Sequence, residues 1–164
     1  MAQQYPFKQK WTEVEKLQNQ GQTKSLIPLL QEIYLAAKEE NQQDDLIKAF
    51  ILKSNISIQT MDDEDIVVQT RDEILQEIEQ STGTQQSILQ TILAQLYLNY
   101  YQNNFYRFQN RTDLAENEST DFRTWTTSKF LQEIDVLLQS SLENKTSLLK
   151  MDPKEVALLL HQVD

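Results

Sequence analysis

The sequence predicts an all-α protein of about seven helices packed in antiparallel pairs. Large apolar residues recur at helical spacing along most of the chain. Only 2 Gly and 3 Pro are present, so tight turns are few, and long helices with polar joints fit better than a many-stranded sheet. A length of 164 residues suits one domain with a sizeable core. We therefore expect residues 1–164 to form a single helical domain.

The most apolar helical stretch, Gln85–Gln102, is expected to be the central helix. Its large side chains follow one another at steps of one and three residues: Ile88, Leu89, Ile92, Leu93, Leu96, Tyr97, Tyr100 and Tyr101. This spacing places them on one broad stripe of a helix, which several other helices must cover. We expect Leu93, Leu96 and Tyr97 to lie at the centre of the protein.

Two helices are expected at the N-terminal end. The first spans roughly residues 7–20 and ends at Gly21, because glycine readily adopts the backbone conformation that terminates a helix. Its apolar face is Trp11, Val14 and Leu17. The second is capped by Thr23 and starts near residues 24–27, because Pro28 is tolerated only in a first turn. It ends near Glu40, and its apolar face is Leu26, Leu29, Leu30, Ile33, Tyr34 and Ala37.

Two more helices precede the central one. The third follows the polar joint Asn41–Asp44 and carries Leu46, Ile47, Phe50, Ile51 and Ile58. The fourth begins at the acidic run Asp62–Asp65, which is favourable at the positive end of the helix dipole, and extends to about Ser81. Its inward residues are Ile66, Val67, Ile74, Leu75 and Ile78.

Residues 103–123 lack a helical period but are too aromatic for a disordered linker. We expect Phe105, Phe108 and Trp125 to be buried against the central helix, and Asp113–Thr120 to form a mobile tip. A sixth helix should start near Thr126 or Thr127, with Phe130, Leu131, Ile134, Leu137, Leu138 and Leu142 inward. The last helix should run from Pro153 to about Gln162, after an N-cap at Asp152.

The amino-acid composition excludes several classes of function and disfavours some classes of binding partner. Lys+Arg of 15 against Asp+Glu of 25 gives a net charge of −10, which disfavours nucleic acid and anionic membranes as partners. The absence of Cys excludes thiol catalysis, thiolate zinc sites and disulfides. The N-terminal residues contain no apolar run that could act as a signal peptide or span a bilayer.

No residue pattern indicates catalysis or a cofactor. His161 is the only histidine and lacks the partners of a catalytic or metal site. The run Asp62–Asp65 lacks the alternating ligands of a calcium loop, so it is interpreted as a solvated helix start. The carboxylate pairs Glu39/Glu40 and Glu77/Glu79 are expected to face solvent. With no phosphate loop either, we expect a protein that is not an enzyme and needs no metal or cofactor.

One aromatic and basic cluster has two interpretations. It comprises Tyr100, Tyr101, Phe105, Tyr106, Arg107, Phe108 and Arg111. The aromatic side chains can hold the long connection on the bundle while the arginines bond helix-end carbonyls, which is the interpretation we favour. Aromatics beside arginine are also enriched where protein partners bind. If the protein binds a partner, Tyr101, Tyr106, Arg107 and Arg111 are the expected contacts.

The apolar face of the second helix matches that of the central helix at a constant offset of 63 residues, with Tyr34 aligned on Tyr97. Amphipathic helices share such spacing by chance, so the match has two explanations. An internal repeat would make the fold an α-solenoid, similar to tetratricopeptide stacking but without a strict period of 34 residues.

Several short stretches together resemble one family. They are Trp11-Thr-Glu-Val-Glu-Lys-Leu, Thr23-Lys-Ser-Leu, Ile33-Tyr-Leu-Ala-Ala-Lys-Glu-Glu-Asn, Gln43-Asp-Asp-Leu-Ile-Lys-Ala, Ser87-Ile-Leu-Gln-Thr-Ile-Leu-Ala-Gln-Leu-Tyr, Asn110-Arg-Thr and Asp121-Phe-Arg-Thr-Trp. In this order they are similar to the N-terminal helical region of the large alpha-2-macroglobulin-like envelope proteins of bacteria, particularly Bacteroidetes. The resemblance covers roughly residues 11–145, and no motif in it is a catalytic fingerprint.

The resemblance implies a non-catalytic helical module, for interaction or positioning, at the N-terminus of a larger protein of the cell envelope, periplasm or secreted fraction. Later β-sandwich domains, and an export signal before Met1, would then belong to the parent protein. The cysteine of a thioester is missing, so protease trapping is not assigned to these residues. The implied partner is protein, for example later domains of the same parent chain. The alternative is a free-standing tetratricopeptide-like adaptor.

Overall fold

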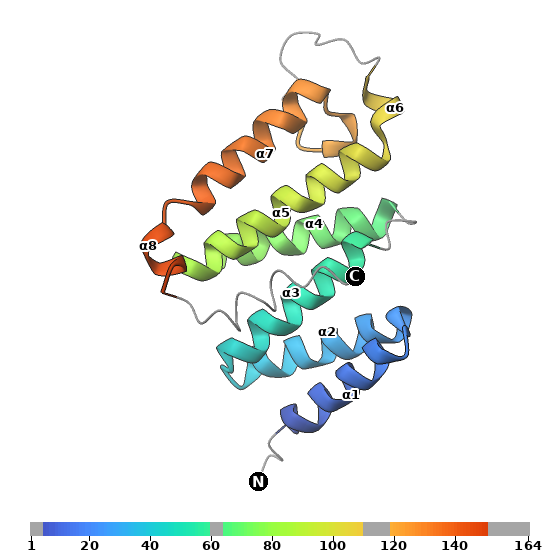
Figure 1. The fold of residues 1–164 in the computed structure, drawn as a ribbon, viewed down its shortest axis with the longest axis vertical. Coiled ribbons are helices and arrows are strands. Elements are labelled where there is room, and N and C mark those ends of the chain that lie inside the picture. The colour runs from blue at the N-terminus through green and yellow to red at the C-terminus, as the bar shows by residue number, and fades with distance from the viewer. Residues whose placement is uncertain (1–4, 60–63, 110–118, 151–164) are drawn as a thin grey trace. The chain divides into compact units, whose positions relative to one another are not determined.

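The structure, a computed structural model, describes residues 5–59, 64–109 and 119–150. Every regular element within these ranges is helical, so the prediction of an all-α protein is confirmed (Figure 1). Close packing groups the described residues into two compact units, residues 5–59 (unit 1) and residues 64–109 with 119–150 (unit 2). That residues 1–164 form one domain stays a prediction, and the helix expected from Pro153 lies outside the described residues.

Unit 1 consists of three consecutive helices, in which α2 packs against both α1 and α3 (Figure 1). Their bounds are α1 Phe7–Asn19, α2 Thr23–Glu39 and α3 Gln43–Gln59. All six apolar residues expected on the inward face of the second helix are buried. Because α2 begins at Thr23, before the expected start, Pro28 lies in its second turn. The amide that would pair with the Lys24 carbonyl is therefore missing.

Both turns of unit 1 use a residue in the left-handed backbone conformation. Gly21, with φ of 65°, ends α1 as expected, and the amide of Gln22 then bonds the Leu17 carbonyl at 3.0 Å. Asn41, with φ of 55°, does the same after α2. Short asparagine side chains tolerate this conformation better than most residues, and the arrangement satisfies carbonyls at the helix end.

Unit 2 is built around α5, which packs against α4, α6, α7 and α8. Its elements are α4 Glu64–Gln80, α5 Gly83–Asn103, α6 Phe105–Phe108, the 3₁₀ helix η1 Phe122–Thr124, α7 Thr127–Ser141 and α8 Lys145–Leu148. The start of α7 is confirmed, because the Thr126 hydroxyl accepts a 3.2 Å hydrogen bond from the Lys129 amide. Leu93, Leu96 and Tyr97 are buried in this unit, and that they lie at the centre of the whole protein stays a prediction.

The two helix faces that match in sequence are both buried, each in its own unit. Every residue of the set on α2 and every residue of the matching set on α5 lies in the core. The matched faces of α2 and α5 are therefore equivalent in that both lie in the core of their units. That this equivalence is an internal repeat stays a prediction.

Several expectations about inward faces are wrong. Ile66 is exposed in the first turn of α4, and Leu131, Leu138 and Leu142 are exposed on α7. Glu77, expected to face solvent, is buried on α4. In each case the helix itself is correct but its covered side differs, because that side depends on neighbouring helices rather than on the helix's own pattern.

Candidate protein-binding surface

The expected partner contacts lie where α5 ends and α6 begins. Asn104 interrupts the helix, and the next four residues form the short helix α6. Tyr106 is 82% exposed, which is unusual for a large aromatic side chain. Phe105 is 42% exposed, so the expectation that it would be buried is wrong. We call Tyr101, Phe105, Tyr106, Arg107 and Glu64 the α6 surface.

Phe108 fixes α6 on the core of unit 2. It is fully buried, as predicted, and its ring centroid lies 4.9 Å from that of Phe130 on α7. It also contacts the rings of Tyr100 and Tyr101 at 6.0 and 6.1 Å. One turn of helix is too short to be stable alone, so this contact positions the exposed residues of α6.

The chain that returns from α6 to α7 is held by a second group of aromatic rings. Trp125 is buried, as predicted, with its ring 5.0 Å from that of Tyr97, and its indole N–H donates to the Ser119 carbonyl at 2.7 Å. Phe122 packs edge-on against Tyr100 at 4.8 Å. Most of the tip expected at residues 113–120 lies outside the described residues.

Glu64 joins the α6 surface to the core. Its Oε1 accepts a hydrogen bond from the Tyr100 hydroxyl at 3.0 Å and forms an ion pair with the Arg107 guanidinium. The hydrogen bond from Arg107 is the main cause that holds the pKa of Glu64 below its ordinary value. Burial, and then the hydrogen bond to Glu64, raise the pKa of Tyr100 to about 12.

Two further arginines of unit 2, Arg123 and Arg71, also bond neighbouring polar groups. Arg123 forms a two-oxygen salt bridge with Asp121, at 2.9 and 3.2 Å, and lowers the pKa of that carboxyl group. Arg71 on α4 donates to the Tyr97 hydroxyl at 3.2 Å and to the Thr120 carbonyl at 2.8 Å. These contacts tie α4 to the segment before α7.

The structure brings three of the four predicted contact residues together. Tyr101 is half-buried, packs edge-on against Phe105 and stacks against Phe108, whereas Tyr106 and Arg107 are exposed. Arg111 lies outside the described residues. Arg107 bonds the side chains of Glu64 and Asn104. The expectation that it would bond a helix-end carbonyl is therefore wrong.

Glu64 was not predicted from the sequence to be part of this surface. Its one signal was an acidic residue in a first helical turn, and that position has a local explanation in the helix dipole. The pairing with Arg107, 43 residues away, depends on tertiary structure alone.

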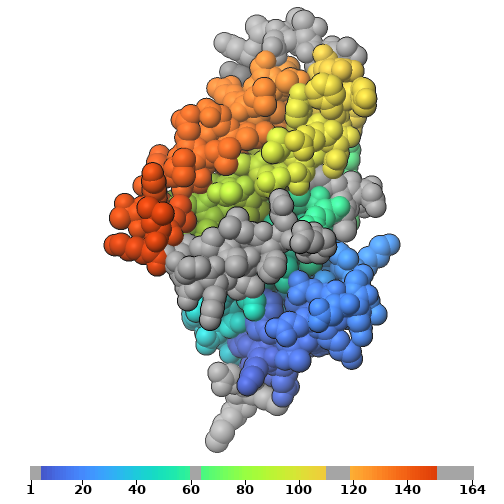
Figure 2. Space-filling model, in the orientation of Figure 1, coloured from blue at the N-terminus to red at the C-terminus, as the bar shows by residue number. Residues whose placement is uncertain are grey.

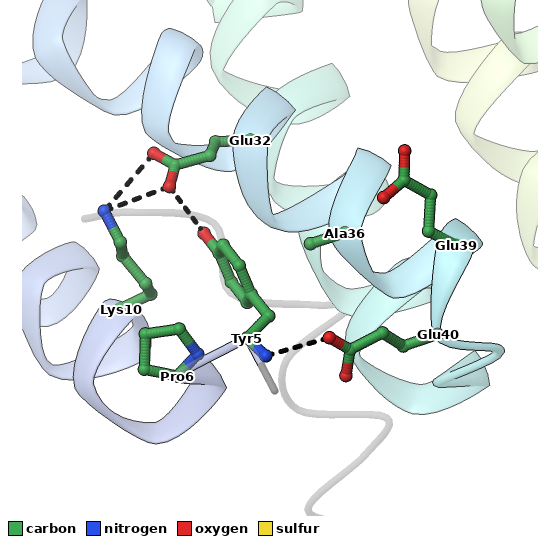
Figure 3. Close-up of a pocket in the computed structure, with 7 residues that line it drawn as sticks. All are labelled: Tyr5, Pro6, Lys10, Glu32, Ala36, Glu39 and Glu40. Carbon is green, nitrogen blue, oxygen red and sulfur yellow. Dashed lines mark hydrogen bonds and ion pairs between the residues drawn. The ribbon is translucent and has the colours of Figure 1, made fainter. Parts of the chain in front are cut away.

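Unit 1 has a separate open pocket of about 490 Å³ between the start of α1 and α2 (Figure 3). The Tyr5 hydroxyl and the Lys10 ammonium both bond Glu32, at 3.0 and 3.1 Å, and the Tyr5 amide donates to Glu40 at 2.8 Å. Burial and the Glu32 bond raise the pKa of Tyr5. Glu39 is exposed as expected and points away from this group, whereas Glu40 is half-buried. Apart from Glu39, the polar groups of the pocket thus bond one another.

Comparisons with protein-family models, with curated proteins and with solved structures find no match for this chain. Among the described residues, no group of three or more His, Cys, Asp or Glu side chains is placed to hold a metal ion. None of the helices in these ranges has the length and apolar character needed to cross a bilayer. His161 and the first two residues of the acidic run Asp62–Asp65 lie outside the described ranges.

Proposed function

We propose that this chain is a non-catalytic helical module that binds protein through the α6 surface. The observation that carries the proposal is the exposure of Tyr106, 82%, on a helix whose position is fixed by the buried Phe108. Burial of a solvent-exposed aromatic ring by a partner stabilises the complex, because apolar surface is removed from water. Tyrosine and arginine are also the residue types that contribute most at protein interfaces.

The α6 surface suits a protein partner electrostatically. Arg107 is already paired with Glu64, and Arg123 with Asp121, so this part of an acidic chain presents little net charge. Interfaces are depleted of unpaired charge at their centre. A neutral, aromatic surface therefore supports protein binding better than binding of a charged small molecule.

We further propose that the module belongs to the N-terminal region of an alpha-2-macroglobulin-like protein of the cell envelope, periplasm or secreted fraction. This rests on the ordered series of short motifs from Trp11 to Trp125. Its partner would be a later domain of the same parent chain. A free-standing adaptor with tetratricopeptide-like stacking is the alternative, supported by the equivalent burial of α2 and α5.

Site-specific photocrosslinking in the native cell tests the proposal. A photoreactive phenylalanine analogue replaces Tyr106, and the matched control carries it at Gln76, which is exposed on α4. Crosslinks to a later part of the same polypeptide support the envelope module, and crosslinks to a separate protein support the adaptor. Equal yields at the two positions would contradict protein binding at the α6 surface.

A double substitution, Arg107→Glu with Arg111→Glu, separates binding from folding. We expect it to reduce the crosslinking yield at position 106 while the circular dichroism spectrum stays unchanged, because Arg107 is exposed. If the double variant unfolds, the arginines are structural and their assignment to partner binding is wrong.

A further inference from the structure

The helix α7 carries a line of leucine side chains that are exposed to solvent. Leu131, Leu138 and Leu142 have exposed fractions of 54%, 42% and 61%. They follow one another after two turns and then one turn, so they lie along one line of the helix. Leu142 is the C-cap residue of α7 and still has helical backbone angles, so the line of leucines continues to the end of the helix. We call these three residues the leucine strip.

The leucine strip lies beside the side of α7 that is packed on α5. On the packed side, Phe130 and Ser141 are buried, and Ile134 and Leu137 are half-buried. Figure 2 shows α7 on the surface of the face in view, with its side chains in orange. Exposed leucine costs about 25 cal/mol per Å² relative to burial, and apolar residues grouped on a surface mark interaction sites.

A single negative charge lies within the leucine strip. Asp135 falls between Leu131 and Leu138 on the same side of α7 and is exposed. It accepts a 2.7 Å hydrogen bond from Gln139 and forms no ion pair with any described residue. The nearest basic residue on this helix, Lys129, is paired with Glu133 at 2.6 Å. The strip thus offers apolar contacts and one carboxylate without a cation.

We propose that the leucine strip binds an amphipathic helix of a protein partner, with Lys or Arg facing Asp135. A straight line of leucines over about 11 residues, or about 16 Å, matches the apolar face of a helix laid alongside it. The basic residue follows from charge complementarity with Asp135. This site uses other residues than the α6 surface, so it is a second interaction and can fail independently.

A second copy of this chain fits the strip poorly. In an antiparallel pair of α7 helices with the two leucine strips opposite each other, Asp135 would face Leu138 of the other copy, and the two Asp135 carboxylates would lie within about one helical turn of each other. Each chain also carries a net charge of −10, which adds repulsion. The partner is therefore a different, basic helix.

Selection from a displayed library tests this proposal. The probe is a library of helical heptad peptides with leucine at positions a and d and random residues elsewhere, selected on the whole chain. The double variant Leu131→Gln with Leu138→Gln removes the apolar contacts, and Leu35→Gln is the matched control because Leu35 is 50% exposed on α2. All these positions are exposed, so we expect the variants to keep the thermal stability of the wild type.

We expect enriched peptides to carry Lys or Arg beside their leucines. Their affinity should fall about tenfold in the double variant and stay unchanged in Leu35→Gln. Asp135→Lys should turn the preference to acidic peptides. The proposal is overturned if no peptide discriminates wild type from the double variant, or if enriched peptides are not basic. Self-association of the wild type in sedimentation, lost in the double variant, would also overturn it.

Discussion

The Tyr100 hydroxyl donates a 3.0 Å hydrogen bond to Glu64, so a carboxylate at the start of α4 is bonded to the core side of α5. The Tyr100 ring is buried, whereas Glu64 is exposed and also pairs with Arg107 on α6. This hydrogen bond therefore couples the core of unit 2 to the α6 surface. Burial, and then this hydrogen bond, raise the pKa of Tyr100 to about 12.

Glu64→Gln should lower the pKa of Tyr100 but leave it above its ordinary value of 10.0, because burial is the larger cause of the increase. In the wild type, the neutral phenol stabilises the fold below pH 10, and this contribution is lost as the pH rises through about 12. NMR titration of tyrosine labelled at Cζ measures the change. An unaltered titration of Tyr100 in Glu64→Gln would show that the hydrogen bond is not formed in solution.

Leu93→Ala should reduce the free energy of unfolding of unit 2 by about 2–5 kcal/mol, because it leaves a cavity on a fully enclosed side of α5. Urea unfolding followed by Trp125 fluorescence, in a Trp11→Phe background, reports on this unit. Leu131→Ala is the control, and should change the free energy by no more than about 0.5 kcal/mol because Leu131 is exposed. Equal losses in the two variants would contradict the arrangement of α5 and α7.

Arg71→Lys should destabilise unit 2 although it keeps the positive charge. The guanidinium donates to the Tyr97 hydroxyl and to the Thr120 carbonyl from different nitrogens, and a lysine ammonium cannot reproduce that fork. We expect a loss of about 1–3 kcal/mol, measured by the same fluorescence assay. Lys150→Arg, at an exposed position, is the matched control for exchanging the two cations. Wild-type stability in Arg71→Lys would mean that charge alone matters here.

The helical fold was predictable from sequence because it is encoded locally. The apolar faces of α2 and α5 repeat at the spacing that places side chains on one side of a helix, and every residue of both matching sets is buried. The end of α1 at Gly21 could likewise be predicted from the local sequence. The left-handed conformation of Asn41 after α2 was not predicted, because asparagine adopts this conformation less regularly than glycine.

The covered side of each helix was predicted less well. Leu138 and Ile66 follow an apolar period, yet both are exposed, because only some sides of α7 and α4 have a neighbouring helix. Likewise, Tyr106 and Arg107 were identified from their composition, but Glu64 was not. A partner 43 residues away leaves no trace in the local pattern.

The proposed binding surface depends on the attachment of α6 to the core of unit 2 through Phe108. Phe108 is fully enclosed by aromatic rings, whereas Phe105, three residues earlier, is 42% exposed. Phe108→Ala should therefore destabilise unit 2 by about 3–5 kcal/mol, and Phe105→Ala by much less. Hydrogen exchange gives the local measurement.

The amides of Arg107 and Gln109 bond the carbonyls of Asn104 and Phe105 at 2.8 and 3.0 Å. In the wild type these amides should exchange slowly, and Phe108→Ala should accelerate their exchange more than Phe105→Ala does, since local opening exposes them. Rapid exchange at both amides in the wild type would refute an ordered α6. The exposed ring of Tyr106 would then have no fixed position from which to bind a partner, and the α6 surface would lose its basis.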